Sequence, residues 1–154
     1  MTECMALLAA YCMTEGASLL QSDCIKAYVQ AEMKGPPTFV RLPRDWWPEA
    51  WKGMRDPVCR LLRAVYGHPQ SGDIWADKLT AELVKEGFQV VEAWPSVYKC
   101  MDGEKLVAMF IIYVDDLVMM GLPAMMPILE RLRKVIQMED PHDLGKYLGC
   151  MHHL

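Results

Sequence analysis

Apolar residues along the chain follow patterns that predict particular elements, and the clearest pattern predicts a β-hairpin. A run of apolar residues begins near Leu106 and continues to Gly121, interrupted by the adjacent Asp115 and Asp116. Unpaired carboxylates are unfavourable in a buried strand, and two adjacent ones also repel each other. The pattern therefore predicts strands at residues 106–114 and 117–121, with both aspartates in the tight turn between them.

Apolar residues at helical spacing predict two long helices. Residues 73–86 carry one apolar stripe, which consists of Trp75, Leu79 and Leu83. Ser71 or Asp73 is a suitable cap for the start of this helix, and Gly87 for its end. The second helix is expected to start between Pro123 and Pro127 and to end near Met138. Its predicted inner face comprises Met125, Ile128, Leu129, Leu132, Val135 and Ile136.

Shorter segments complete the predicted fold. Residues 5–13 favour a short helix, and Asp102-Gly103 is typical of a hairpin turn. Strands are expected at residues 19–25, 38–42, 88–92, 96–101 and 146–151. This mixture of helices and antiparallel hairpins is typical of the α+β class. We expect the helices to cover one face of the antiparallel sheet, which leaves the other face free for a ligand.

The composition describes one folded domain. The chain has 154 residues, of which 53% are hydrophobic and 23% charged, as in a globular protein. The apolar run around the acid pair is too short and too charged to cross a bilayer, so we expect no membrane partner. Residues 1–13 lack the features of a signal peptide. Six cysteines without a C-x-x-C pair indicate reduced thiols inside a cell.

Charge is unevenly distributed along the chain. A net charge of −4 is unusual for a nucleic-acid-binding protein. Residues 34–63, however, hold seven basic and three acidic side chains, a net charge of +4, and also Trp46, Trp47 and Trp51. Such a segment suits a surface that follows a nucleic-acid backbone and stacks on its bases. The alternative is a solvated loop that buried tryptophans hold in place.

The acid pair allows two interpretations by itself. Neighbouring carboxylates on a rigid turn are hard oxygen ligands, which divalent cations favour. Aspartate is also common in turns for conformational reasons, so Asp115 and Asp116 could equally form an ordinary solvated turn. Other segments of the chain favour the first interpretation.

Four motifs lie in order along the chain. Tyr113-Val114-Asp115-Asp116 resembles the Y-x-D-D box of reverse transcriptases of the Ty1/copia retrotransposon type. The segment Asp23-Cys24-Ile25-Lys26-Ala27-Tyr28 is similar to their first acidic motif. Residues 66–72, followed by Trp75, resemble the Y-G-x-x-Q-x…W signature, and residues 143–149 the D-L-G…K-Y-x-L-G segment. The set extends over most of the chain, and its ordered occurrence is specific.

The resemblance implies a polymerase palm. The expected fold is an antiparallel sheet with helices packed on one face, part of a truncated right-hand polymerase. Residues 1–154 would then form the palm and part of the fingers, with the N-terminal part of the fingers, the thumb and the ribonuclease H region absent. One departure is His68-Pro69, which stands where the family usually has Leu-Lys.

The resemblance also implies an RNA-directed DNA polymerase that adds nucleotides to a primer 3′-hydroxyl. That reaction uses two divalent ions about 3.5–4 Å apart. Asp23, Asp115 and Asp116 would be the catalytic residues and the metal ligands. The expected ions are two Mg²⁺, with Mn²⁺ as the alternative.

Other positions acquire roles from the same resemblance. The backbone N–H groups of Lys26 and Ala27 would contact the triphosphate, and Tyr28 would lie under the sugar as a steric gate. Gln70 would contact the nucleotide or the template, while Tyr113 and Val114 would lie at the primer terminus. Simpler alternatives are a core aromatic for Tyr28, a polar turn residue for Gln70 and a strand residue for Val114. Lys146 is interpreted as a solvated lysine.

The implied partners are an RNA or DNA template–primer, deoxynucleoside triphosphates and the remaining segments of a Pol polyprotein. The implied location is the cytoplasm, including virus-like particles. Two alternatives remain open from the sequence. One is a folded but inactive polymerase remnant. The other is a small metal-binding or interaction module, in which Cys150, His152 and His153 offer ligands for Zn²⁺.

Overall fold

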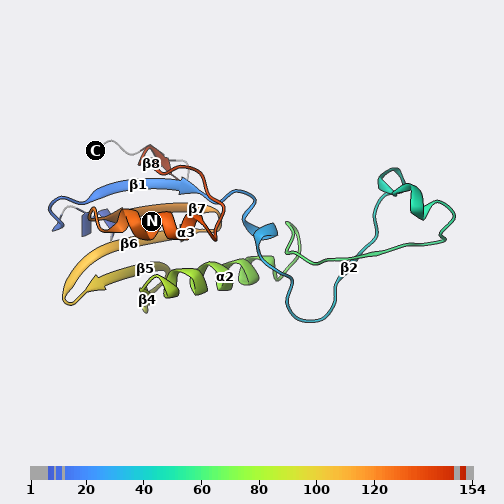
Figure 1. Ribbon diagram of the computed structural model, residues 1–154, viewed down its shortest axis with the longest axis horizontal. Helices are drawn as coiled ribbons and strands as arrows, with labels where there is room; N and C mark the ends of the chain where they lie inside the picture. The colour runs from blue at the N-terminus through green and yellow to red at the C-terminus, as the bar shows by residue number, and fades with distance from the viewer. Residues whose placement is uncertain (1–6, 9, 12, 148–149, 152–154) are drawn as a thin grey trace.

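The computed structural model describes residues 7–8, 10–11, 13–147 and 150–151, and its main feature is a six-stranded antiparallel sheet. The strand order is β4-β5-β6-β7-β1-β8 (Figure 1). The strands are β1 (Ser18–Asp23), β4 (Phe88–Val91), β5 (Trp94–Asp102), β6 (Lys105–Tyr113), β7 (Asp116–Gly121) and β8 (His142–Asp143). Together with two helices, this sheet gives the expected α+β class.

The predicted hairpin is present, with its two-residue turn one position earlier than expected. Tyr113 at the end of β6 pairs with Asp116 at the start of β7, so only Val114 and Asp115 lie in the turn. The prediction that both aspartates lie in the turn is therefore wrong for Asp116, which is a strand residue. The tight connection is possible because Val114 adopts a positive φ of 59°, as two-residue hairpin turns require.

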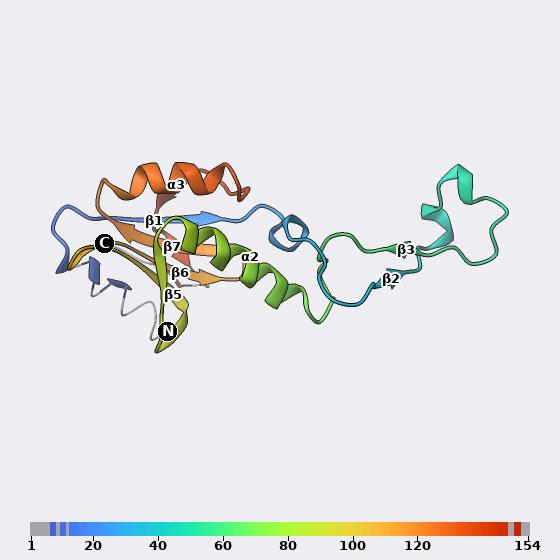
Figure 2. The same cartoon turned by 60° about the horizontal axis from the view of Figure 1, so that its bottom comes forward.

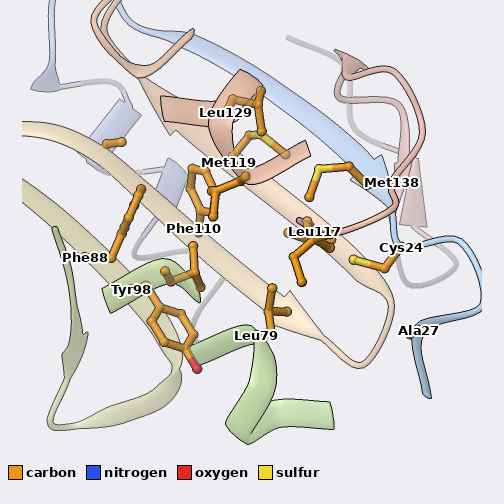
Figure 3. Packing of buried hydrophobic residues seen from close by; sticks show 14 of the residues in the cluster. Cys24, Ala27, Leu79, Phe88, Tyr98, Phe110, Leu117, Met119, Leu129 and Met138 are labelled. Atoms are coloured by element: carbon orange, nitrogen blue, oxygen red, sulfur yellow. The ribbon is translucent and has the colours of Figure 1, made fainter. Parts of the chain in front are cut away.

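Helices α2 (Ser71–Lys85) and α3 (Met125–Arg133) pack against the same face of the sheet (Figure 2). Figure 3 shows part of the cluster of buried side chains that fills the space between them. The predicted stripe of α2 is confirmed, since Trp75, Leu79 and Leu83 are all buried. Members of the cluster from α3 and the sheet include Met125, Leu129, Leu132, Phe110, Leu117 and Met119.

Helix α3 ends earlier than the predicted Met138. Beyond Arg133 the chain turns, and Val135, expected on the inner face, is 51% exposed. The backbone of residues 137–139 bonds instead to the end of β1: Ile25 N–H donates to the Gln137 carbonyl (3.0 Å), and Glu139 N–H to that of Asp23 (2.9 Å). These long-range bonds compete with further helix, and they extend the sheet beyond Asp23.

The opposite face of the sheet is covered along part of its length, which differs from the expectation that it is free. A second apolar cluster lies there, formed by Leu7, Leu19, Val97, Ile111, Val118, Met120, Leu144 and Tyr147. In the predicted 5–13 helix, the described positions 7, 8, 10, 11 and 13 are helical, and the other positions lie outside the described residues. The cover therefore comes from both ends of the chain.

The single strand predicted at residues 146–151 is two short strands. These are β9 (Lys146–Tyr147) and β10 (Cys150–Met151), which pair antiparallel with each other. The two residues between these strands lie outside the described residues.

Residues 32–63, which we call the arm, project away from the sheet (Figures 1 and 2). The arm follows the 3₁₀ helix η1 (Ala27–Gln30) and contains β2 (Phe39–Val40) paired with β3 (Cys59–Arg60), with η2 (Arg44–Trp46) and η3 (Glu49–Trp51) between them. No residue of the arm is buried. Trp46 is 72% exposed, and Trp47 and Trp51 are half-buried, so the interpretation as a loop held by buried tryptophans is wrong.

None of the helices in the described ranges combines the length and the hydropathy that a bilayer span requires.

Gly121 allows β7 to pass closely beneath α3, and this contact can be tested. A Cβ atom at Gly121 would lie 2.5 Å from Met125 Sδ and 3.0 Å from the Val107 carbonyl oxygen. We expect Gly121→Ala to lower the free energy of unfolding by about 1–3 kcal/mol through overpacking.

Urea denaturation of the purified variants measures this effect. Gly72→Ala is the matched control, because its added methyl group meets no atom within 4 Å and lies inside α2. That variant should be neutral or slightly stabilising. Equal losses in both variants would contradict the proposed close contact.

Candidate active site at the ends of β1 and the β6–β7 hairpin

The register between β1 and β7 places two aspartates opposite each other. Asp23, the last residue of β1, is the direct partner of Asp116, the first residue of β7. Side chains of directly opposed residues point to the same face, with Cβ atoms about 4.5–5.5 Å apart. Asp115 follows in the turn, where its carbonyl accepts a hydrogen bond from Cys24 N–H (2.8 Å). The early aspartate and the acid pair therefore meet at one end of the sheet.

The opposed pair lies on the face of the sheet away from α2 and α3. Side chains alternate along β7: Leu117 and Met119 belong to the cluster beneath the helices, whereas Val118 belongs to the cluster on the other face. Asp116 shares the orientation of Val118, and the register gives Asp23 the same orientation. The apolar cover on this face does not include the strand ends, because Asp23 is exposed and Asp116 half-exposed.

Burial and neighbouring charges both act on the protonation of the carboxylates. Burial and the charges of Asp115 and Glu139 raise the pKa of Asp23 above its usual range. Burial and the charges of Asp23 and Asp115 likewise raise the pKa of Asp116. The buried Cys24 thiol beside them has its pKa raised to about 12, chiefly by burial and then by the same three aspartates. A cation among these groups would relieve the repulsion.

The turn that carries Asp115 is fixed by a contact from α2. Trp75 Nε1 donates a hydrogen bond to the Val114 carbonyl (2.7 Å). Trp75 is itself buried, so its indole ring connects the hydrophobic core to the turn. Val114 has the left-handed conformation that a β-branched residue rarely adopts. The helix contact helps to maintain this strained position next to the acids.

A pocket of about 320 Å³ adjoins the turn on its other side. It is lined by Tyr28, Gly72, Trp75, Ala76, Leu79, Pro95, Ser96, Tyr98, Ile112, Tyr113 and Val114. The three aspartates do not line it, so the pocket borders the acidic site and does not contain it. The structure thus brings together Tyr28, Tyr113 and Val114, which the sequence analysis assigned to the nucleotide and the primer. Tyr113 is 58% exposed there.

Tyr66 belongs to the site, although the sequence analysis gave it no role. Its ring packs against that of Tyr28 with centroids 4.6 Å apart. Burial and the charge of Asp115, with smaller contributions from Tyr28 and Asp23, raise the pKa of its phenol. Tyr66 is the first residue of the motif that contains Gln70. Its place in that motif could have indicated a role at the site.

The other three residues that the resemblance assigns to the nucleotide, Lys26, Ala27 and Gln70, differ in exposure. Lys26 is exposed and has a left-handed backbone (φ 52°), and Ala27 is fully buried at the start of η1. Gln70 is exposed at the N-cap of α2, and its side chain makes no hydrogen bond within the described residues. The neighbouring Ser71 is buried and does not cap the helix, as its hydroxyl donates to the Val65 carbonyl (2.7 Å).

The donor chemistry of the three aspartates suits a hard divalent cation. In the described ranges, no group of three or more His, Cys, Asp or Glu side chains is spaced to hold a metal ion. The strand register therefore makes the carboxylates neighbours, but their side chains are not arranged as the ligands of a metal ion. Of the residues considered for Zn²⁺, His152 and His153 lie outside the described residues, as does the side chain of Cys150.

Comparisons with known proteins identify the family of the chain. The family model for reverse transcriptase (RNA-dependent DNA polymerase) matches residues 1–153. The chain is 30% identical over 102 residues to the Transposon Ty1-BL Gag-Pol polyprotein of Saccharomyces cerevisiae (strain ATCC 204508 / S288c), a match covering 66% of this chain and 5% of the relative. The Truncated transposon Ty1-A Gag-Pol polyprotein of the same organism is 29% identical, over 66% of this chain and 8% of the relative. No solved structure matches.

The raised pKa of Asp116 predicts a pH-dependent effect of its removal. Its carboxyl group binds a proton more tightly in the folded than in the unfolded chain. The stability that this provides is complete below the ordinary pKa of 3.8 and is lost as pH rises through the raised pKa. We expect Asp116→Asn to melt about 1–3 °C higher than the unmodified chain at pH 7, a small gain because the group is partly solvated.

Thermal melts across the acid range, with and without Mg²⁺, test this. The gain should vanish below about pH 4, where both chains are neutral at this position. Saturating Mg²⁺ should stabilise the unmodified chain more than Asp116→Asn. If Asp116→Asn were less stable than the unmodified chain at neutral pH, the proposed repulsion between Asp116 and the neighbouring carboxylates would be wrong.

Removing the Trp75 hydrogen bond should weaken the turn. Trp75→Phe keeps an aromatic ring in the core but loses the donor to the Val114 carbonyl, and we expect a loss of about 1–2 kcal/mol in the free energy of unfolding. Urea denaturation measures it. Trp46→Phe is the control, because Trp46 is exposed on the arm and should change stability by less than about 0.5 kcal/mol. Equal losses of stability in the two variants would show that the hydrogen bond from the Trp75 indole does not contribute to the free energy of unfolding.

Proposed function

The chain belongs to the reverse transcriptase (RNA-dependent DNA polymerase) family, and on that premise we propose that it carries the catalytic carboxylates of a Ty1/copia-type RNA-directed DNA polymerase. The observation that supports this best is the β1–β7 register. It brings Asp23 opposite Asp116, with Asp115 in the adjoining turn, on the face that α2 and α3 leave uncovered. We propose that this face is the palm surface of the polymerase.

The three aspartates are proposed to hold divalent cations, with Mg²⁺ favoured because it binds to a few carboxylates and to phosphate oxygens. Bound cations would lower the pKa of the primer 3′-hydroxyl and stabilise the leaving pyrophosphate. The raised pKa values of Asp23 and Asp116 support this assignment, since among the described residues neither carboxylate forms an ion pair with a basic side chain. Mn²⁺ is a suitable replacement by the same chemistry.

The residues around the acids are proposed to position the reactants. The reaction joins the primer 3′-oxygen to the α-phosphorus of a nucleoside triphosphate and releases pyrophosphate. Tyr28, packed against Tyr66, would support the sugar and exclude a 2′-hydroxyl, while Tyr113 and Val114 contact the primer terminus. The backbone N–H groups of Lys26 and Ala27 would contact the triphosphate. Gln70, exposed at the start of α2, is available to a nucleotide or template strand.

The wider setting is also a proposal. The matched segment spans 5% to 8% of the length of these Gag-Pol relatives. We therefore propose that the chain works with further segments of a Pol polyprotein, and that its partners are a template–primer and deoxynucleoside triphosphates. The division into palm and partial fingers assigns the arm to the fingers. The cytoplasm, including virus-like particles, is the corresponding location.

Primer extension on an RNA template in the presence of Mg²⁺ tests the proposal. Asp115→Asn removes one carboxylate from the turn and should reduce extension by at least about 100-fold, or about 2.7 kcal/mol in the barrier. Asp102→Asn is the matched control, because this exposed aspartate lies in the hairpin at the other end of β6. Its activity should match that of the unmodified chain.

The two alternatives give different results in the same experiment. An inactive remnant would bind Mg²⁺ in an Asp115-dependent manner but extend no primer. A zinc-binding module would retain stoichiometric Zn²⁺ after purification and show no dependence on Asp115. Extension that survives Asp115→Asn would overturn the assignment of the catalytic carboxylates.

A further inference from the structure

A second pocket, distinct from the one beside the turn, lies where the arm joins the sheet. Its volume is about 390 Å³, and it is lined by Lys26, Val29, Gln30, Arg63, Lys134, Val135 and Gln137. Three of these side chains are cationic and none is acidic. They come from three separate segments: the loop after β1, the base of the arm and the C-terminal end of α3. Figure 2 shows the loop after β1 and the C-terminal end of α3 at the end of the sheet from which the arm projects.

The cations around this pocket are incompletely neutralised by the protein. Neither Lys26 nor Lys134 forms an ion pair in the part of the chain that the structure describes. Arg63 lies 3.7 Å from the Glu32 carboxylate, and it also donates a hydrogen bond to the Gln30 carbonyl (3.1 Å). Two lysines without a carboxylate partner among the described residues thus lie beside an arginine that contacts Glu32 and Gln30.

Hydrogen bonds of Gln30 connect two of the segments that line the pocket. The Gln30 side-chain amide donates to the carbonyls of Ile25 and Gln137 (2.8 Å each), and its oxygen accepts from Gln137 N–H (2.8 Å). These bonds connect the loop after β1 to the segment after α3. Lys26 also holds a left-handed backbone (φ 52°, ψ 49°), which is unfavourable for a residue with a Cβ atom. The fold therefore keeps like charges close together in a preformed and locally strained site.

We propose that this pocket binds a phosphate group. Lysine ammonium groups bind phosphate as compact point charges, and an arginine adds directed donors. A phosphate group carries the negative charge that the described lining residues lack. Because the lining is basic on all three contributing segments, a cation or an apolar ligand does not match it.

The phosphate has two possible sources, and naming the source rests on the proposed function. One is a nucleotide or its pyrophosphate product, because Lys26 lies in the loop that follows Asp23. The other is the backbone of a nucleic-acid strand, because Arg63 is the last residue of the arm, whose residues 34–63 carry a net charge of +4. Both sources present the same chemistry to the pocket.

Binding measurements without metal and without catalysis test the site. Lys134→Gln removes one charge from a residue with no proposed catalytic role, and Lys134→Arg keeps the charge. Lys105→Gln is the matched control, because Lys105 is an exposed lysine in the hairpin at the opposite end of the sheet. The probes are inorganic tripolyphosphate, measured by calorimetry, and a labelled single-stranded DNA oligonucleotide, measured by fluorescence anisotropy at several salt concentrations.

We expect Lys134→Gln to lower the affinity for at least one probe by about 3–10-fold. The affinities of Lys134→Arg should be close to those of the unmodified chain, and those of Lys105→Gln should be unchanged. A lower affinity for tripolyphosphate alone assigns the pocket to a nucleotide or pyrophosphate. Loss for the oligonucleotide, with the salt slope reduced by about 0.7, assigns it to a strand. Unchanged affinity for both probes, or an equal loss in Lys105→Gln, would overturn the proposal.

These results are independent of polymerase activity. Asp115→Asn, which should abolish primer extension, should leave Lys134-dependent phosphate binding intact. A chain that extends no primer but loses phosphate binding in Lys134→Gln would refute the proposed function and retain this site. Circular dichroism of each variant checks that the exposed substitution at the end of α3 has not unfolded the chain.

Discussion

The pairing of β1 with β7 is the interaction on which the rest of the structure depends. It runs in register from Ser18 opposite Gly121 to Asp23 opposite Asp116, so one continuous ladder joins the apolar interior to the acidic end. Met119 and Leu117 fix the face of β7 that packs beneath the helices. A shift by one residue would exchange the two faces of the strand and separate the aspartates. Core packing thus determines where the carboxylates lie.

The energetics of this end of the sheet are unfavourable by themselves. Three carboxylates lie close together, and the pKa values of Asp23 and Asp116 are raised by burial and by neighbouring carboxylates, among which Asp115 acts on both. Bonds from outside the acidic site hold the arrangement: Trp75 binds the turn at Val114, and the Ser22 hydroxyl donates to the Glu139 carbonyl (2.9 Å). The apolar interior offsets the repulsion, and a cation would remove it. This is the pattern expected where function opposes stability.

The arm differs from the sheet in burial, in exposed aromatic side chains and in charge. It has no buried residue, exposes Trp46 and Phe39, and carries a positive charge in an otherwise acidic chain. Its internal contacts are local, such as the Arg41–Asp56 ion pair (2.7 Å) and the Arg44 guanidinium 5.6 Å from the Trp47 ring centroid. At its base, where Arg63 meets Gln30, the arm contributes to the basic pocket. The phosphate site therefore belongs to the junction of arm and sheet.

The sequence by itself determined the features that depend on local periodicity and on motifs. The apolar run into Asp115 predicted the hairpin, and the spacing of Trp75, Leu79 and Leu83 predicted the buried stripe of α2. Tertiary structure decided what local patterns do not encode. Asp116 became a strand residue because the ladder continues to Tyr113, and Val135 became exposed because residues 137–139 bond to the end of β1. The partnership of Tyr66 with Tyr28, and the meeting of Lys26 with Lys134, arise only when distant segments pack together. Periodicity reports which face of an element is apolar, whereas the folded chain sets which charged ends become neighbours.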